Sequence, residues 1–140
     1  MKKVNVIIEK GKDALWGRIE GIGDFLPVTT GANINEVLSS LKMLIADYVE
    51  HEGQEDKKWK NIDPESLSFE IHYDLRAFFD EFDFLNASSI AAKANINRSL
   101  LSQYINGVKY PSDKQAKRVE TAIHEMAKKM NSVSLVGSTL

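Results

Sequence analysis

The sequence predicts an α+β protein in which a small module of strands and one helix is followed by a domain made only of helices. Residues 1–73 contain several short segments in which apolar residues alternate with polar ones, whereas from residue 74 to about 131 apolar residues recur at helical spacing. The sign of the charge also changes between these two parts. We therefore expect an α+β domain at 1–73, a helical domain at 74–131 and a flexible tail at 132–140.

The chain begins with three short strand segments. Apolar and polar residues alternate from Val4 to Ile8, and a second strand at 15–20 follows a glycine-containing turn at 10–13, which is a hairpin signal. A third strand is expected at 27–30, because Pro27 suits the start or edge of a strand and two β-branched threonines follow it.

One amphipathic helix and a fourth strand complete the first module. Asn33 and Glu36 have the spacing of a capping box, so a helix should begin there. Its apolar residues recur at helical spacing: Val37, Leu38, Leu41, Leu44, Ile45 and Tyr48. The polar segment from Glu50 to Asp63 should be an exposed connection with Trp59 as its only large apolar residue, and strict alternation at 67–73 predicts the last strand.

Helices are expected throughout the second part. Asp74 is of a residue type that caps helix N-termini, and an apolar stripe follows it: Leu75, Phe78, Phe79, Phe82 and Leu85. Two short helices should follow at 87–94 and 98–105, the second one between the cap Asn97 and the terminator Gly107. After Pro111, a capping box at 112–115 begins a last helix with Ala116, Val119, Ile123, Met126 and Met130 on one face.

The net charge of −2 hides a division between two oppositely charged parts. Residues 1–85 carry 10 Lys/Arg and 17 Asp/Glu, whereas residues 86–140 carry 8 and 3. The acidic part and the basic part should have different partners, and the basic one is able to approach a polyanion.

Several classes of function are disfavoured by composition. The chain has no cysteine, and its histidines, His51, His72 and His124, are far apart, so we expect no metal and no cofactor. The acidic residues Glu9, Glu20, Asp24 and Glu70 are scattered, and we expect no nuclease or other enzyme activity. There is neither a signal-peptide pattern nor an apolar run of membrane length, so a cytoplasmic protein with no membrane contact is expected.

The two short helices have the arrangement of a helix-turn-helix, whose second helix enters the DNA major groove. Small or apolar residues let the helices cross: Ile90, Ala91, Ile96, Leu101 and Ile105. Polar residues of types that contact bases or phosphates fall on the other side. The candidate DNA-binding residues are Asn97, Arg98, Ser99, Ser102, Gln103, Asn106 and Lys109. Lys93 and Lys114 are further candidates for phosphate contacts.

The stretch from Leu75 to Met130 resembles the lambda-repressor-like, or Xre, family of DNA-binding domains, and residues 88–107 followed by Pro111 match the core pattern of that family. Ala87 stands where that family often has a glutamine that contacts DNA, so this position is assigned no contact. Asn95 stands where the family often has glycine, and asparagine tolerates the left-handed conformation of such a turn.

The order of strands and helix in the first part, with residues 30–37 leading into the helix, resembles the HicB antitoxin family. That resemblance implies a partial ribonuclease-H-like module before a DNA-binding domain. It also implies an antitoxin that neutralises a small, basic, RNA-cleaving toxin of the HicA type and represses its own operon. An acidic surface suits a basic partner.

A stand-alone repressor is the alternative, with a first module that senses a ligand or only dimerises. A homodimer or higher homo-oligomer is expected in either case, because one helix-turn-helix reads only a half-site. The exposed face of the sheet or the last helix, with Met126 and Met130, could supply the contact between subunits.

Overall fold

A computed structural model describes residues 2–138, and the chain forms two compact units, the first ending at Glu81 and the second beginning at Phe82. The first unit contains β1 (Lys3–Lys10), β2 (Leu15–Glu20), β3 (Val28–Gly31), α1 (Ile34–His51), β4 (Ser68–Tyr73) and α2 (Leu75–Glu81). The second contains α3 (Ala87–Ala94), α4 (Arg98–Ile105) and α5 (Asp113–Asn131). The described chain is therefore an α+β protein, as the sequence predicts.

The strands form one mixed sheet in the order β3-β2-β1-β4. The hairpin predicted from the alternating residues pairs β1 with β2 antiparallel, with Val6 opposite Ile19, and β3 continues the antiparallel arrangement. β4 lies parallel to β1, with Val4 beside Phe69. A parallel neighbour requires a crossover, and α1 with its connections provides it.

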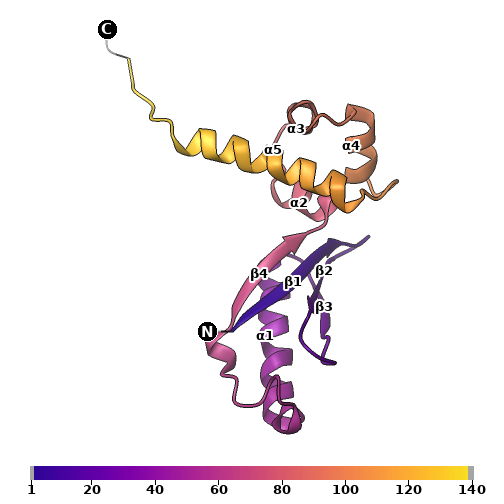
Figure 1. Cartoon of the computed structure of the whole chain (residues 1–140), viewed down its shortest axis with the longest axis vertical. Coiled ribbons are helices and arrows are strands. Elements are labelled where there is room, and N and C mark those ends of the chain that lie inside the picture. The colour runs from indigo at the N-terminus through magenta and orange to yellow at the C-terminus, as the bar shows by residue number, and fades with distance from the viewer. Residues whose placement is uncertain (1, 139–140) are drawn as a thin grey trace. The chain divides into compact units, whose positions relative to one another are not determined.

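Helix α1 covers one face of the sheet and encloses the core of the first unit (Figure 1). Val37, Leu41 and Ile45 are fully buried at the spacing of one helix face, against Val6 and Ile8 of β1 and their neighbours. The helix comes very close to β2 at Gly17, where an added Cβ would lie 2.2 Å from Cγ1 of Val37.

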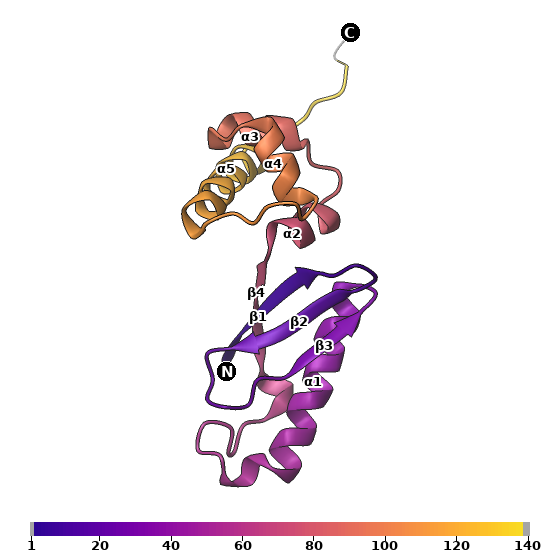
Figure 2. The same ribbon diagram turned by 90° about the vertical axis from the view of Figure 1, so that its right-hand side faces the viewer.

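The opposite face of the sheet carries no helix of the first unit (Figure 2). Trp16 and Val28 are 48% and 52% exposed there. Trp16 lies between the buried residues Leu15 and Gly17 of β2, and Val28 is followed by the half-buried Thr29 in β3. Between them, Arg18 donates a hydrogen bond to Glu9 at 2.7 Å and pairs with Glu20, which raises the pKa of the guanidinium. This open face therefore combines apolar side chains with paired charges.

The segment between α1 and β4 is expected to be an exposed connection, but its Trp59 is fully buried. Most residues between α1 and β4 are exposed, but the Trp59 ring meets Phe25 edge to face at 5.4 Å. Phe25 in turn stacks on Tyr48, whose hydroxyl donates a hydrogen bond to Asp56 at 2.7 Å. The connection is thus anchored on the end of α1 by aromatic contacts.

Helix α2 belongs with the first unit because it packs on β1 and β4, whereas the sequence analysis places this segment in the second domain. Asp74 caps it as expected, accepting a hydrogen bond from the Ala77 N–H at 2.7 Å. The helix ends at Glu81, before the end of the apolar stripe. A turn in which the Leu85 N–H donates to the Phe82 carbonyl then leads to α3.

The capping signals read from the sequence have the expected contacts. Asn33 accepts from the Glu36 N–H at 2.9 Å, and Ser112 accepts from the Gln115 N–H at 3.2 Å. The Glu36 carboxylate accepts from the Ala32 N–H, one residue before the cap. Among residues 2–138, no helix is long and apolar enough to cross a membrane.

Replacing Gly17 with alanine should destabilise the first unit by about 1–3 kcal/mol, because the new methyl group overlaps Val37 and forces α1 away from the sheet. Urea unfolding followed by tryptophan fluorescence measures this, since both tryptophans, Trp16 and Trp59, lie in that unit. Gly137→Ala is the control, because a Cβ at Gly137 meets nothing within 4 Å. Equal stability of both variants would contradict the close packing of α1.

Candidate nucleic-acid interface

Two short helices, α3 and α4, are joined by a turn of three residues. Asn86 caps α3 by accepting from the Ser89 N–H at 3.1 Å. Asn95 has the left-handed conformation (φ 57°, ψ 47°) and ends the helix, and the Ile96 N–H then donates to the Ala91 carbonyl at 2.9 Å. A left-handed residue at the end of α3 turns the chain into α4 without a longer loop.

The second unit is held together by small and apolar residues at the helix contacts. Four of the five residues expected to let α3 and α4 cross are buried, and Ala91 is only 1% exposed. The fifth, Ile105, is half-buried. Tyr104 is also buried, although the sequence analysis did not single it out. The buried residues of this unit are Ile90, Ala91, Ala94, Ile96, Leu101, Tyr104, Val119 and Ala122. This packing fixes which face of α4 remains exposed.

The predicted DNA-binding residues lie on the exposed side of α4 and on the loop that follows it. Arg98, Ser99, Ser102, Asn106 and Lys109 are exposed, and Gln103 is half-buried. The predicted residues of α4 lie three or four positions apart, which is the spacing of one helix face, and Lys109 lies in the loop after the helix.

Asn97 has a structural contact that limits its role. Its side-chain oxygen accepts from the Ser99 N–H at 2.8 Å and from the Leu100 N–H at 3.4 Å, so it caps α4. Asn106 is also engaged, since its side-chain NH₂ donates to the Ser102 hydroxyl at 3.3 Å. Arg98 and Ser99, in the first turn, have side chains available for contacts with another molecule.

The loop after α4 is ordered by its own backbone. Gly107 has φ 75°, and the N–H groups of Val108 and Lys109 both donate to the Gln103 carbonyl, at 2.9 and 3.2 Å. Val108 and Tyr110 are 69% and 86% exposed on either side of Lys109. The sequence analysis missed these two side chains, because an apolar residue in a loop gives no periodic signal.

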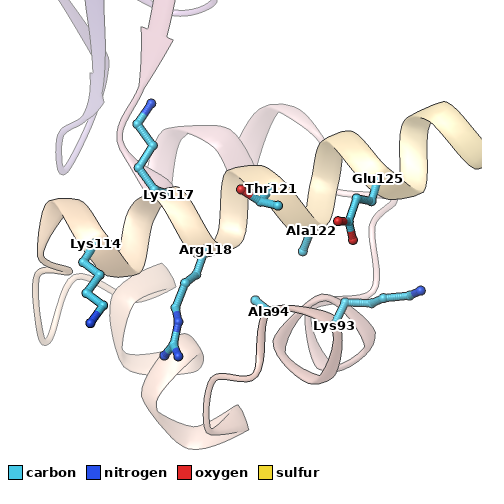
Figure 3. A pocket seen from close by; sticks show the side chains of 8 residues that line it. All are labelled: Lys93, Ala94, Lys114, Lys117, Arg118, Thr121, Ala122 and Glu125. Atoms are coloured by element: carbon cyan, nitrogen blue, oxygen red, sulfur yellow. The ribbon is translucent and has the colours of Figure 1, made fainter.

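Further cations lie between α3 and α5. Lys93 and Lys114, considered as phosphate contacts, line a hollow there together with Lys117 and Arg118 (Figure 3). Lys117 donates to Glu120 at 2.8 Å, and this hydrogen bond raises the pKa of Lys117. Lys117 and Arg118 were not among the residues predicted from the sequence, although their spacing from Lys114 by three and four residues places all three on neighbouring helix positions.

The acidic residues considered for nuclease chemistry do not gather. Glu9 and Glu20 both pair with Arg18, and Glu70 lies 3.9 Å from the Lys3 ammonium. Within residues 2–138, no three histidine or carboxylate side chains are grouped so that they could hold a metal ion.

Comparisons of the chain with protein-family models, with curated proteins and with solved structures find no match. Support for a function therefore comes from the residues and their geometry.

Substitution of Asn95 tests the turn between α3 and α4. Asn95→Gly should preserve the stability of the second unit, because glycine has no Cβ to strain the left-handed conformation. Asn95→Ala should lower it by about 1 kcal/mol, because alanine keeps the Cβ but lacks the short polar side chain with which asparagine hydrogen-bonds locally in this conformation. Thermal unfolding followed by far-ultraviolet circular dichroism measures the difference. Asn131→Ala, at the exposed end of α5, is the control. A turn that tolerates alanine as well as glycine would not have this conformation.

Proposed function

We propose that the chain is a sequence-specific DNA-binding transcriptional regulator in which α3 and α4 form a helix-turn-helix and α4 is the recognition helix. The observation that carries this proposal is the combination of the small, buried residue Ala91 on α3, a left-handed turn at Asn95 and an exposed polar first turn beginning at Arg98. A recognition helix contacts base edges mainly from its N-terminal residues.

The chemistry of the exposed residues fits DNA. An arginine donates two hydrogen bonds to the guanine O6 and N7 atoms, and serine hydroxyls contact bases or phosphates. Arg98 and Ser99 are placed at the start of α4 for such contacts, and Lys109 follows its end. Residues 82–140 carry eight Lys/Arg against four Asp/Glu, which attracts a polyanion.

The first unit supports the more specific proposal of an antitoxin. Residues 1–81 carry ten Lys/Arg against sixteen Asp/Glu, and Trp16 and Val28 are exposed on the open face of the sheet. A large aromatic residue surrounded by polar groups is typical of the energetically important part of a protein interface. In this proposal the open face binds a small basic toxin of the HicA type, the acidic surplus of the unit attracts that toxin, and the regulator represses its own operon.

The proposed regulator acts as a homodimer or a higher homo-oligomer. One α4 helix reads one half-site, and a second subunit reads the other about one DNA turn away. The homodimer thereby binds a two-fold symmetric operator with twice the number of base contacts.

Two single substitutions separate base contacts from phosphate contacts. Arg98→Ala should weaken binding to the gene's own promoter by about 1–3 kcal/mol and reduce the preference over random DNA, because it removes a base contact. Lys109→Ala should weaken binding to every duplex and lower the slope of log affinity against log salt concentration by about one. Fluorescence anisotropy over a salt series measures both quantities.

Lys128→Ala is the matched control for these variants, since Lys128 is an exposed cation in the last turn of α5, away from α4 in sequence. It should change neither the preference nor the slope as much. If Arg98→Ala and Lys109→Ala bind the promoter like the unmodified protein, the assignment of α4 as the recognition helix is wrong.

The next substitution tests whether the open face of the sheet binds a basic partner protein. Trp16→Ala should weaken binding to a small basic protein encoded by the neighbouring gene by about 2 kcal/mol, as expected for a central aromatic contact. Met43→Ala is the control, because Met43 is 73% exposed on α1. Isothermal titration calorimetry measures the affinities. No binding of such a protein, together with intact promoter binding, would favour the stand-alone repressor.

A further inference from the structure

The hollow between α3 and α5 has small side chains at its floor and basic side chains around its rim (Figure 3). Its volume is about 360 Å³. Ala94 and Ala122, both buried, meet at the floor, where small side chains let the helices approach. Lys114 and Arg118 extend from α5 to the same side, and Lys93 extends from α3 at the other end. The hollow is therefore formed by a close helix contact flanked by long cationic side chains.

The charge of this hollow is largely uncompensated. Half of the eight Lys/Arg residues of the second unit line it, whereas Glu125 is the one acidic residue among the lining side chains. Lys93, Lys114 and Arg118 form no ion pair with any residue that the structure describes. Arg118 donates one hydrogen bond, to the Gln115 side chain at 3.3 Å. Because like charges repel each other, such a cluster favours a bound anion.

The donors around the hollow suit phosphate groups. Arginine presents a planar fork of N–H donors that binds two phosphate oxygens at once, and lysine adds a point charge. Lys114 and Arg118 are about one helical turn apart, and the Thr121 hydroxyl, next along the same side of α5, is a further donor. A row of donors along a helix fits a polymer of repeated phosphates better than one small anion.

The place of the hollow in the chain connects it to α4. Lys93 and Ala94 end α3, and the turn that follows them leads directly to Arg98 at the start of α4. We infer that this hollow binds backbone phosphates of the operator and so positions the first turn of α4 against the bases. The inference rests on the proposed DNA-binding function, and it adds a phosphate site that extends beyond α4 and its following loop.

The test compares two double variants that remove the same charge from the same helix. Lys114→Gln with Arg118→Gln should lower the slope of log affinity against log salt concentration by about two, since about 0.9 is lost for each phosphate contact. The preference for the promoter over random duplex should not change, because phosphates carry no sequence information. The control is Lys128→Gln with Lys129→Gln, two exposed residues outside the hollow, which should leave the slope close to that of the unmodified protein.

Equal changes of slope in the two double variants would overturn the inference, because only the total charge would then matter. A loss of sequence preference in the Lys114 and Arg118 variant would also overturn it, by assigning these residues to base contacts. Titration with inorganic pyrophosphate tests whether the hollow binds a free phosphate anion rather than the phosphates of DNA. Tight pyrophosphate binding that the variant loses, with unchanged DNA binding, would make the hollow a site for a free anion.

The unmodified protein distinguishes this inference from the proposed function. If it binds its promoter specifically while the Lys114 and Arg118 variant binds in the same way at every salt concentration, only the inference about the hollow is wrong. If it binds no duplex at all, the proposed function is wrong, and the inference that rests on it is wrong too.

Discussion

The close approach of α1 to the sheet at Gly17 is the constraint on which the first unit depends. With no Cβ at this position, the Val37 side chain reaches the backbone of β2, and the apolar stripe of α1 then covers the strands in a single layer. One helix is enough to bury one face, so the opposite face, with Trp16 and Val28, stays open. The surface available to a partner is thus a consequence of how the core is closed.

In the second unit, alanine residues allow the close packing of helices, as Gly17 allows the close approach of α1 to the sheet in the first. Ala91 is buried on α3, which packs against both α4 and α5, and Ala94 and Ala122 line the hollow where α3 meets α5. Small residues at the contact points keep the helices close, and longer polar or cationic residues begin immediately beside them. The exposed face of α4 and the basic hollow between α3 and α5 both lie beside these helix contacts. Charged side chains can therefore gather there without entering the core.

The sequence predicts local features of this chain better than features that depend on distant residues. Caps at Asn33, Asn97 and Ser112 act within three residues of themselves, so their pattern is sufficient to locate the helix starts. Burial of Trp59 depends on Phe25, more than thirty positions away, and no local pattern reports it. The parallel placement of β4 beside β1 likewise depends on the whole crossover through α1.

The candidate site likewise has one part that can be predicted from local sequence and one part that depends on distant residues. The polar face of α4 is visible from sequence because a single helix determines which residues share a face. The hollow requires Lys93 from α3 and Arg118 from α5, and only the packing of Ala94 near Ala122 brings them together. The spacing of Lys114, Lys117 and Arg118 indicates a basic helix face, but it does not indicate what that face meets.

The small net charge of the chain is no argument against binding to DNA. At physiological ionic strength the Debye length is about 8 Å, so exposed charges further apart than this are largely screened from each other. A folded unit of the size of residues 82–140 has a radius of gyration of about 10 Å. If DNA is bound as proposed, a phosphate near Arg98 or Arg118 would respond mainly to charges within the Debye length, and the second unit itself carries eight basic residues against four acidic ones. Lower salt extends the range of both fields, so the acidic unit should oppose DNA binding more strongly there, while the phosphate contacts themselves become stronger.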